Sequence, residues 1–118
     1  ERRAAGVLRL VRDTVTRAPT SFGHALCALD LYLSPPRELA IVGPRDDEAT
    51  RDLARAALRD WQPNTVVARS ESGDEQVALL AGKGLVGGRP AVYVCESFAC
   101  QAPVTDPREL NGRLTSRG

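Results

Sequence analysis

The segment 89–104, which reads RPAVYVCESFACQAPV, constrains the fold more than any other part of the sequence. A run of β-forming residues passes through Cys95, and a second run passes through Cys100. With Ser97 and Phe98 as the two loop residues, these runs predict a tight β-hairpin. Serine-phenylalanine is not a favoured two-residue turn, so a four-residue loop stays open as an alternative. In both cases the two cysteines face each other across the hairpin.

Cys95 and Cys100 are the candidate redox or disulfide pair. In a two-residue hairpin they form the second residue pair from the turn, which is not hydrogen-bonded and has Cα atoms about 4.5 Å apart. That separation is near the short limit that disulfides tolerate. A structural or reversible disulfide therefore competes with two buried thiols that pack as apolar residues, which we favour. A zinc half-site is the third interpretation, weakened because only His24 and Cys27 remain as further ligands.

The first 34 residues predict a pair of helices. Apolar residues recur at helical spacing over residues 4–17, with arginines off the stripe, as in an amphipathic helix. A second helix is expected from Thr20 to Leu33, and apolar residues extend nearly all round it. Such a helix must be covered on more than one side. We therefore expect residues 1–34 to pack against a neighbouring domain that is missing from this chain.

Residues 35–118 predict a small α/β domain with flanking helices. The pattern predicts strands at 38–43, 65–69, 91–96 and 99–104, helices that start near Asp46 and Asp106, and a single helical turn at 76–81. The first of these helices is expected to run through Trp61. Right-handed crossovers make the first three strands parallel, and the hairpin places the fourth antiparallel at an edge. The sequence thus predicts a mixed sheet of about four strands, three parallel and one antiparallel.

Composition bears on the class of partner and on the source of the chain. Sixteen basic residues nearly balance fifteen acidic ones, which gives no electrostatic case for nucleic acid or an anionic membrane. No apolar stretch approaches the roughly 20 residues that span a bilayer, and we see no signal peptide. The sequence starts at Glu1 and lacks methionine, so we expect a fragment or a processed piece. Its arginine, alanine and proline content is typical of a high-GC bacterial gene, and three cysteines without a secretory signal indicate reduced thiols in a cytoplasm.

We expect no catalytic, cofactor or metal site. The glycine-rich segment 82–88 does not match a phosphate loop, because Gly84 follows Lys83 where Ser or Thr is needed, and a strand follows the loop. His24 is the only histidine and is expected to be a packed or capping residue. A small-molecule site at the carboxyl end of the strand 38–43 stays open as an alternative, although no GxGxxG motif supports a dinucleotide there.

Two runs of the sequence resemble a known family. They are ELAIVG at 38–43 and, above all, PAVYVCESFACQAPVTDPREL at 90–110. With these runs the chain resembles the C-terminal end of the thioredoxin-domain-containing family typified by spermatogenesis-associated protein 20, and the resemblance covers nearly the whole chain. The positions that match the family's motif are Pro90, Tyr93, Cys95, Phe98, Cys100, Pro103, Asp106 and Pro107.

The resemblance implies a larger protein with a thioredoxin-like domain followed by an α/α toroid similar to that of sugar epimerases and six-hairpin glycosidases. Residues 1–34 resemble the last helical layer of that toroid, and residues 35–118 a C-terminal domain. We expect a non-catalytic, cytoplasmic module without cofactors that packs against the toroid and stabilises it. Its partner is then the rest of the parent chain, or a second copy of the fragment. The alternative is a redox-active module that uses Cys95 and Cys100, serving the thioredoxin-like domain.

Overall fold

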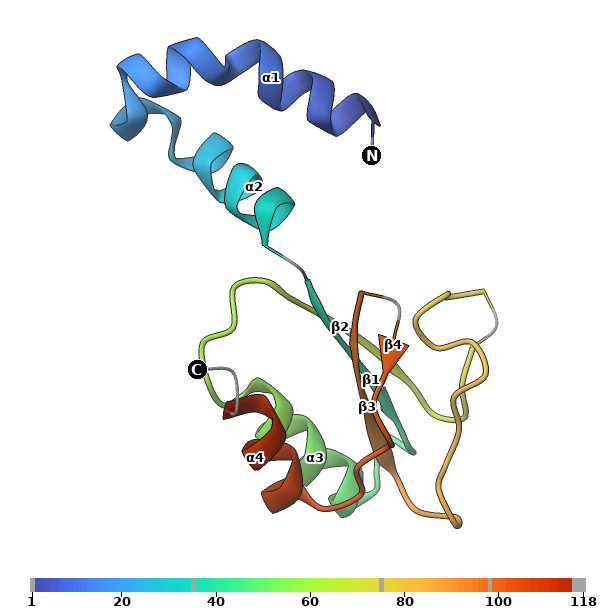
Figure 1. The fold of residues 1–118 in the computed structure, drawn as a ribbon. Coiled ribbons are helices and arrows are strands. Elements are labelled where there is room, and N and C mark those ends of the chain that lie inside the picture. The colour runs from blue at the N-terminus through green and yellow to red at the C-terminus, as the bar shows by residue number, and fades with distance from the viewer. Residues whose placement is uncertain (1, 35, 75, 98, 116–118) are drawn as a thin grey trace. The chain divides into compact units, whose positions relative to one another are not determined.

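The chain forms two compact units, Glu1–Pro35 and Pro36–Gly118. We call the first the helical unit and the second the α/β unit. The structure is a computed structural model that describes residues 2–34, 36–74, 76–97 and 99–115 (Figure 1).

The helical unit begins with the expected amphipathic helix, α1 (Arg2–Arg17). One stripe of α1 side chains is half-buried, and the other described residues of the helix are exposed; the stripe consists of Ala5, Leu8, Val11 and Val15. The chain then passes through a 3-10 helix, η1 (Pro19–Phe22), into α2 (Gly23–Leu33). The second helix, expected from about Thr20 to Leu33, is helical over that range, but it is not α-helical from its start. Proline followed by two hydroxyl residues favours a turn, so the first turn is 3-10 and α2 begins at Gly23.

Among its described residues the α/β unit contains a four-stranded sheet and two helices: β1 (Arg37–Val42), α3 (Glu48–Leu58), β2 (Thr65–Ser70), β3 (Ala91–Glu96), β4 (Ala99–Cys100) and α4 (Pro107–Thr115). The strand order is β2-β1-β3-β4. β1 pairs with β2 in parallel, whereas the β1–β3 and β3–β4 pairs are antiparallel. The predicted α/β class and the mixed four-stranded sheet are confirmed.

The prediction of three parallel strands is wrong, because β3 runs antiparallel to β1. A parallel β3 requires a crossover from one end of the sheet to the other, usually through a helix. Here the segment 71–90 leaves β2 after Ser70 and enters β3 at Ala91, and both of these residues are paired with Val42. The connection thus starts and finishes at the same end of the sheet, so β3 must run back. The described residues of 76–81 form turns, and one of them is closed, as predicted, by a hydrogen bond of helical spacing from the Ala81 N–H to the Val77 carbonyl at 3.0 Å.

β1 is the centre of the sheet and is packed on both faces. Leu39 and Ile41 point to the face that α3 and α4 cover, where the larger core lies (Figure 1). Ala40 and Val42 point to the opposite face, which Leu80 of the connecting segment covers. Successive side chains of a strand alternate between faces, and here both faces are apolar. That explains why β1 has the nearly continuous apolar sequence of a fully buried strand.

Both helices of the α/β unit begin at an aspartate, as predicted. The Asp47 carboxylate accepts a hydrogen bond from the backbone N–H of Ala49 at 3.2 Å. The Asp106 carboxylate accepts one from the backbone N–H of Arg108 at 2.7 Å. Each carboxylate satisfies a backbone donor that has no partner inside the helix, which stabilises the first turn. The buried apolar residues of α3 and α4 then face the sheet.

Helix α3 ends at Leu58, three residues before the predicted end at Trp61. The residues that bury α3 against the sheet end at Ala57, so no apolar stripe continues beyond it. The Trp61 side chain is 89% exposed and lies outside the core.

The returning strand is much shorter than the predicted 99–104, because a bulge interrupts it after Cys100. In the register of the Cys95–Cys100 pair, Val92 is expected to face Pro103. The structure pairs Val92 with Val104 instead, which is a shift of one residue. Proline has no N–H to donate to a ladder, so the strand accommodates Pro103 in the bulge.

Candidate functional site: the Cys95–Cys100 hairpin

The hairpin has the predicted register. Glu96 pairs with Ala99 next to the turn, and Cys95 pairs with Cys100. The backbone N–H of Gln101 donates to the carbonyl of Val94 at 2.9 Å. This bond flanks the cysteines, so they form the non-hydrogen-bonded pair, in which side chains lie closest.

The turn itself carries the strain expected of a loop without the favoured residues. Ser97 has a φ of 50°, the left-handed conformation that two-residue hairpin turns need and that glycine or asparagine adopts more readily. Phe98, the other predicted loop residue, lies outside the described residues. The matched twist of the two strands is thus achieved with a serine at the first loop position.

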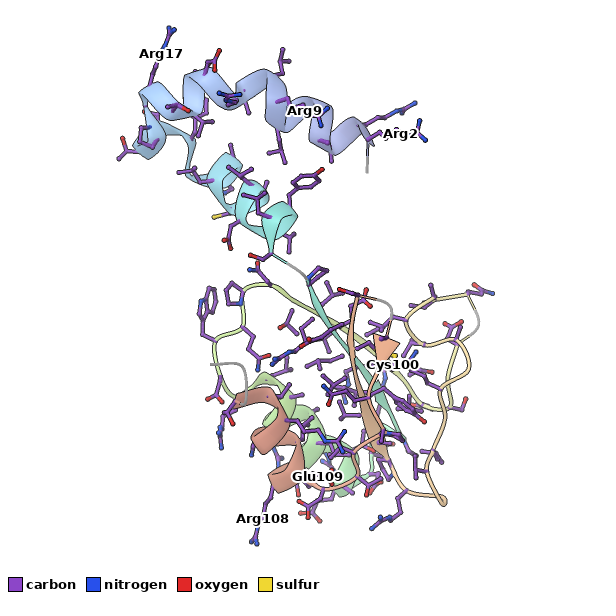
Figure 2. All side chains as sticks on the ribbon, viewed as in Figure 1. Arg2, Arg9, Arg17, Cys100, Arg108 and Glu109 are labelled. Atoms are coloured by element: carbon purple, nitrogen blue, oxygen red, sulfur yellow. A yellow bond between two sulfur atoms is a disulfide. The ribbon has the colours of Figure 1, made fainter. Side chains whose placement is uncertain are left out.

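Of the three interpretations of the cysteine pair, the structure contains the disulfide. The Sγ atoms of Cys95 and Cys100 are bonded, and the Cα atoms are 3.9 Å apart. The two halves of the bond differ in environment, because Cys95 is 1% exposed whereas Cys100, which Figure 2 labels, is exposed. Cys27 is a free, exposed thiol in the helical unit. A bond between the sulfurs does not by itself assign a redox function, which stays a prediction.

The turn end of the hairpin is joined to the last helix through a buried arginine. Arg37 Nε donates to Glu96 Oε1 at 3.1 Å, and Arg37 Nη1 donates to the Leu114 carbonyl at 2.9 Å. The Arg37 side chain is buried. A buried guanidinium needs such partners, since an unpaired charge inside a protein is costly. Sequence reasoning missed Arg37, because a single arginine before an apolar strand carries no periodic signal.

The other residues singled out in the sequence do not form a site. His24 and Cys27 are both exposed on α2, and no group of three or more metal-binding side chains occurs within the described ranges. The glycine-rich segment 82–88 is an ordered connector and is tied to the sheet by Tyr93. The Tyr93 hydroxyl donates to the Gly84 carbonyl at 2.9 Å. A metal ion or a phosphate is not needed to explain any of these residues.

A shallow cleft lies at the carboxyl ends of β1 and β2, where a small-molecule site stayed open. Its volume is about 450 Å³ and its lining is polar: Gly43, Arg45, Arg69, Ser70, Glu71 and Ser72. Both arginines are exposed, and Glu71 opposes their charge. The glycine at its floor has a packing role, because a Cβ on Gly43 would clash with Thr50 Oγ1 and lie 2.7 Å from Pro90 Cβ. The cleft thus has charged side chains in its lining, but they do not define a position for a ligand.

The helical unit carries a second, mainly apolar groove between α1 and α2, with a volume of about 430 Å³. Its apolar lining includes Leu8, Val11, Val15, Leu26, Leu29 and Tyr32, and its polar lining includes Arg9 and Arg12. We call it the helical groove. No described residue of α1, η1 or α2 is buried. The helices therefore contact each other along one stripe without closing a core.

Similarity to known proteins is confined to one part of much longer chains. Spermatogenesis-associated protein 20 of Homo sapiens and that of Rattus norvegicus are each 26% identical to the chain over 114 residues, and that of Mus musculus is 25% identical. Each match covers 92% of this chain and 14% of the relative. The chain thus spans about one seventh of the length of these relatives. No family model and no solved structure matches the chain.

Within the ranges that the structure describes, no helix has both the length and the apolar character that crossing a bilayer requires.

Proposed function

We propose that the chain is a non-catalytic C-terminal module of a longer protein, and that its helical unit packs against an α/α toroid in that protein and stabilises it. The similarity to spermatogenesis-associated protein 20 supports this proposal, because the match includes most of this chain and a small share of each relative. The rest of the parent chain is then the main partner. A bacterial source and a cytoplasmic location stay predictions from composition and cysteine content.

The observation that carries the proposal is the exposed apolar surface of the helical unit. Leu33 is 70% exposed, Leu26 and Tyr32 are also exposed, and all three line the helical groove. Exposed leucines are common singly, but a contiguous apolar patch marks a contact surface. Burying apolar area contributes roughly 25 cal/mol per Å², so covering this surface favours a docked state.

The helical groove fits an amphipathic helix with an acidic rim. Its floor is apolar, so it accepts the apolar stripe of a third helix, as layers of a helical toroid do. Helix α1 carries five arginines against a single acidic residue, Asp13. Arg9 and Arg12 lie at the edge of the groove itself (Figure 2 labels Arg9). Opposite charge on the partner helix would set its orientation more than its affinity.

Paired substitutions on α1 test the docking role. Leu8 is half-buried and lines the helical groove, whereas Leu10 is on the same helix, is exposed and does not line it. In the intact parent protein, Leu8→Asp is expected to lower the Tm of the toroid by at least about 2 °C, because it places a carboxylate in the contact. Leu10→Asp is the control and is expected to leave the Tm within about 1 °C.

Two results would count against the proposal. Equal Tm values for Leu8→Asp, Leu10→Asp and the unmodified parent would mean that the helical groove is not a contact surface. A parent protein whose toroid keeps its Tm after deletion of this whole segment would remove the stabilising role. For the isolated chain, size-exclusion chromatography with light scattering separates a monomer from a dimer that buries the same groove.

A further inference from the structure

We propose that the Cys95–Cys100 bond is a reversible thiol–disulfide exchange site, and that Cys100 is the sulfur that an incoming low-molecular-weight thiol attacks. This inference does not depend on the docking role. It rests on three features of the hairpin: the unequal exposure of the two cysteines, the open edge beside Cys100, and the short ladder that holds β4.

Unequal exposure decides which sulfur a thiol can reach. Cys95 lies on β3, is 1% exposed, and is flanked by β1 on one side, where it pairs with Glu38. Cys100 lies on β4, the last strand of the order β2-β1-β3-β4, and is exposed. A thiolate displaces the far sulfur of a disulfide, so it must approach in line with the S–S bond from the outer side. Burial closes that line of approach at Cys95, whereas it is open at the exposed Cys100.

The exchange is a two-electron reduction in two steps. A thiolate RS⁻ bonds to Cys100 Sγ, the Cys95–Cys100 S–S bond breaks, and its electron pair leaves on the Cys95 sulfur, which takes up a proton. A second thiolate then attacks the R sulfur of the mixed disulfide and releases Cys100 as a thiolate. The products are two protein thiols and one oxidised disulfide, RS–SR. A small dithiol, or two molecules of a glutathione-type monothiol, supplies both electrons.

The hairpin can open and close around this chemistry at little structural cost. β4 has two residues, and the ladder beyond it is held by the Gln101–Val94 hydrogen bond before the bulge. The core residues of β3, by contrast, stay paired to β1 along six residues. Cys95 is therefore held in place after reduction while Cys100 is free to move. Because the two thiols remain tethered across the same turn, re-oxidation is intramolecular and regains the same pair.

The first test measures how the folded protein is reduced. In a Cys27→Ser background, which removes the remaining thiol, the oxidised chain is treated with dithiothreitol, quenched with N-ethylmaleimide and weighed by mass spectrometry. We expect two adducts to form under native conditions, at a rate proportional to the dithiothreitol concentration. A rate that is independent of dithiothreitol concentration, or that matches global unfolding, would overturn the proposal, because reduction would then need an unfolded hairpin.

The second test measures the asymmetry directly. Cys95→Ala leaves Cys100 alone, and Cys100→Ala leaves Cys95 alone, both in the Cys27→Ser background. We expect oxidised glutathione to form a mixed disulfide at Cys100 at least about tenfold faster than at Cys95, since access limits exchange at a buried sulfur. Equal rates in folded variants, checked by circular dichroism, would contradict the assignment of Cys100. Should Cys95→Ala unfold, reduced glutathione replaces dithiothreitol in the first test, and peptide mapping of the quenched mixed disulfide locates it on Cys100 or, against the proposal, on Cys95.

A third result bears on reversibility. The reduced chain, again in the Cys27→Ser background, is placed in a glutathione buffer. The fraction with a Cys95–Cys100 bond is followed as the ratio of oxidised to reduced glutathione is raised. A smooth transition from two free thiols to none supports an exchange site. Two thiols that stay free at every ratio would overturn the proposal.

Discussion

The helical unit and the α/β unit bury their apolar residues to very different degrees. None of the described residues of α1, η1 or α2 is buried, although α2 is more apolar than any other helix of the chain. In the α/β unit a single core joins both helices to the sheet, and its largest members, including Leu39, Ile41, Leu53 and Leu110, are fully buried. The unit that contains the most apolar helix thus has no buried residue among the described residues of its helices, whereas the more polar helices of the other unit contribute to a buried core.

The difference follows from the number of layers. A helix presents one apolar stripe, and two helices side by side can cover each other along one line only. A sheet has two faces, and here α3 and α4 cover one face while the connecting segment covers the other. Stable domains need at least two layers around a common core, which the α/β unit has. The four experiments below test this comparison, in order of decreasing expected effect.

The largest effect is expected from a cavity in the α/β core. Leu53→Ala removes a leucine that is 1% exposed on α3, and is expected to lower the free energy of unfolding by about 2–5 kcal/mol. Leu58→Ala, on the same helix but 59% exposed, is the control and should change it by less than about 0.5 kcal/mol. Urea denaturation measures both. Similar losses for the two variants would mean that α3 is not packed as described.

A smaller effect is expected where the backbone comes too close for a side chain. Gly43→Ala introduces a Cβ that overlaps Thr50 Oγ1 and Pro90 Cβ, and is expected to cost about 1–3 kcal/mol of unfolding free energy. Gly84→Ala is the matched control, because a Cβ there has no neighbour within 4 Å. Thermal unfolding of both variants checks the difference. A stable Gly43→Ala variant would show that the end of β1 is packed more loosely than the structure indicates.

The cap of α3 is expected to contribute about 1 kcal/mol. Asp47→Ala removes the acceptor for the Ala49 backbone N–H, and the usual cost of losing such a cap is about 0.5–2 kcal/mol. The neighbouring Asp46→Ala is the control, since the contact seen for Asp46 uses its backbone carbonyl, which accepts from Arg51. Equal losses of unfolding free energy for the two variants, measured by guanidinium denaturation, would mean that Asp47 is not the cap of α3.

The smallest effect is expected from removal of the helical unit, and this experiment tests the difference between the two units most directly. Removal of residues 1–34 is expected to change the free energy of unfolding of the α/β unit by less than about 0.5 kcal/mol, because that unit has its own core. Residues 1–34 alone are expected to be largely unfolded, since isolated short helices are marginal in water. Circular dichroism of both pieces tests this. A large loss of stability in residues 36–118 would break the comparison and show that the two units depend on each other.

Local signals in the sequence predicted the elements and the cysteine register well. The amphipathic stripe of α1, the aspartates at the starts of α3 and α4, and the Cys95–Cys100 pairing all depend on neighbours within a few residues. Spacing along a strand or a helix determines which of these residues can meet. The pairing of the two cysteines needed no information from the rest of the chain.

Long-range features were not predictable in the same way. The direction of β3 depends on the end of the sheet to which the segment 71–90 returns the chain. No residue pattern in that segment indicates which end this is. The Arg37 contacts join β1, β3 and α4, which lie far apart in the sequence. The one-residue bulge at Pro103 can be recognised only from the pairing of Val92 with Val104. Each is a property of tertiary packing, which propensity does not encode.

The antiparallel pairing of β1 with β3 also orders events during synthesis. Its register runs from Arg37–Glu96 to Val42–Ala91, so the middle of the sheet joins segments made at very different times. Until residues 91–96 have been made, β1 has only β2 as a strand partner, and its other edge stays unpaired. Such edges recruit chaperones or neighbouring nascent chains. The interval before residue 96 leaves the ribosome is thus the period in which this protein is most exposed to misassembly.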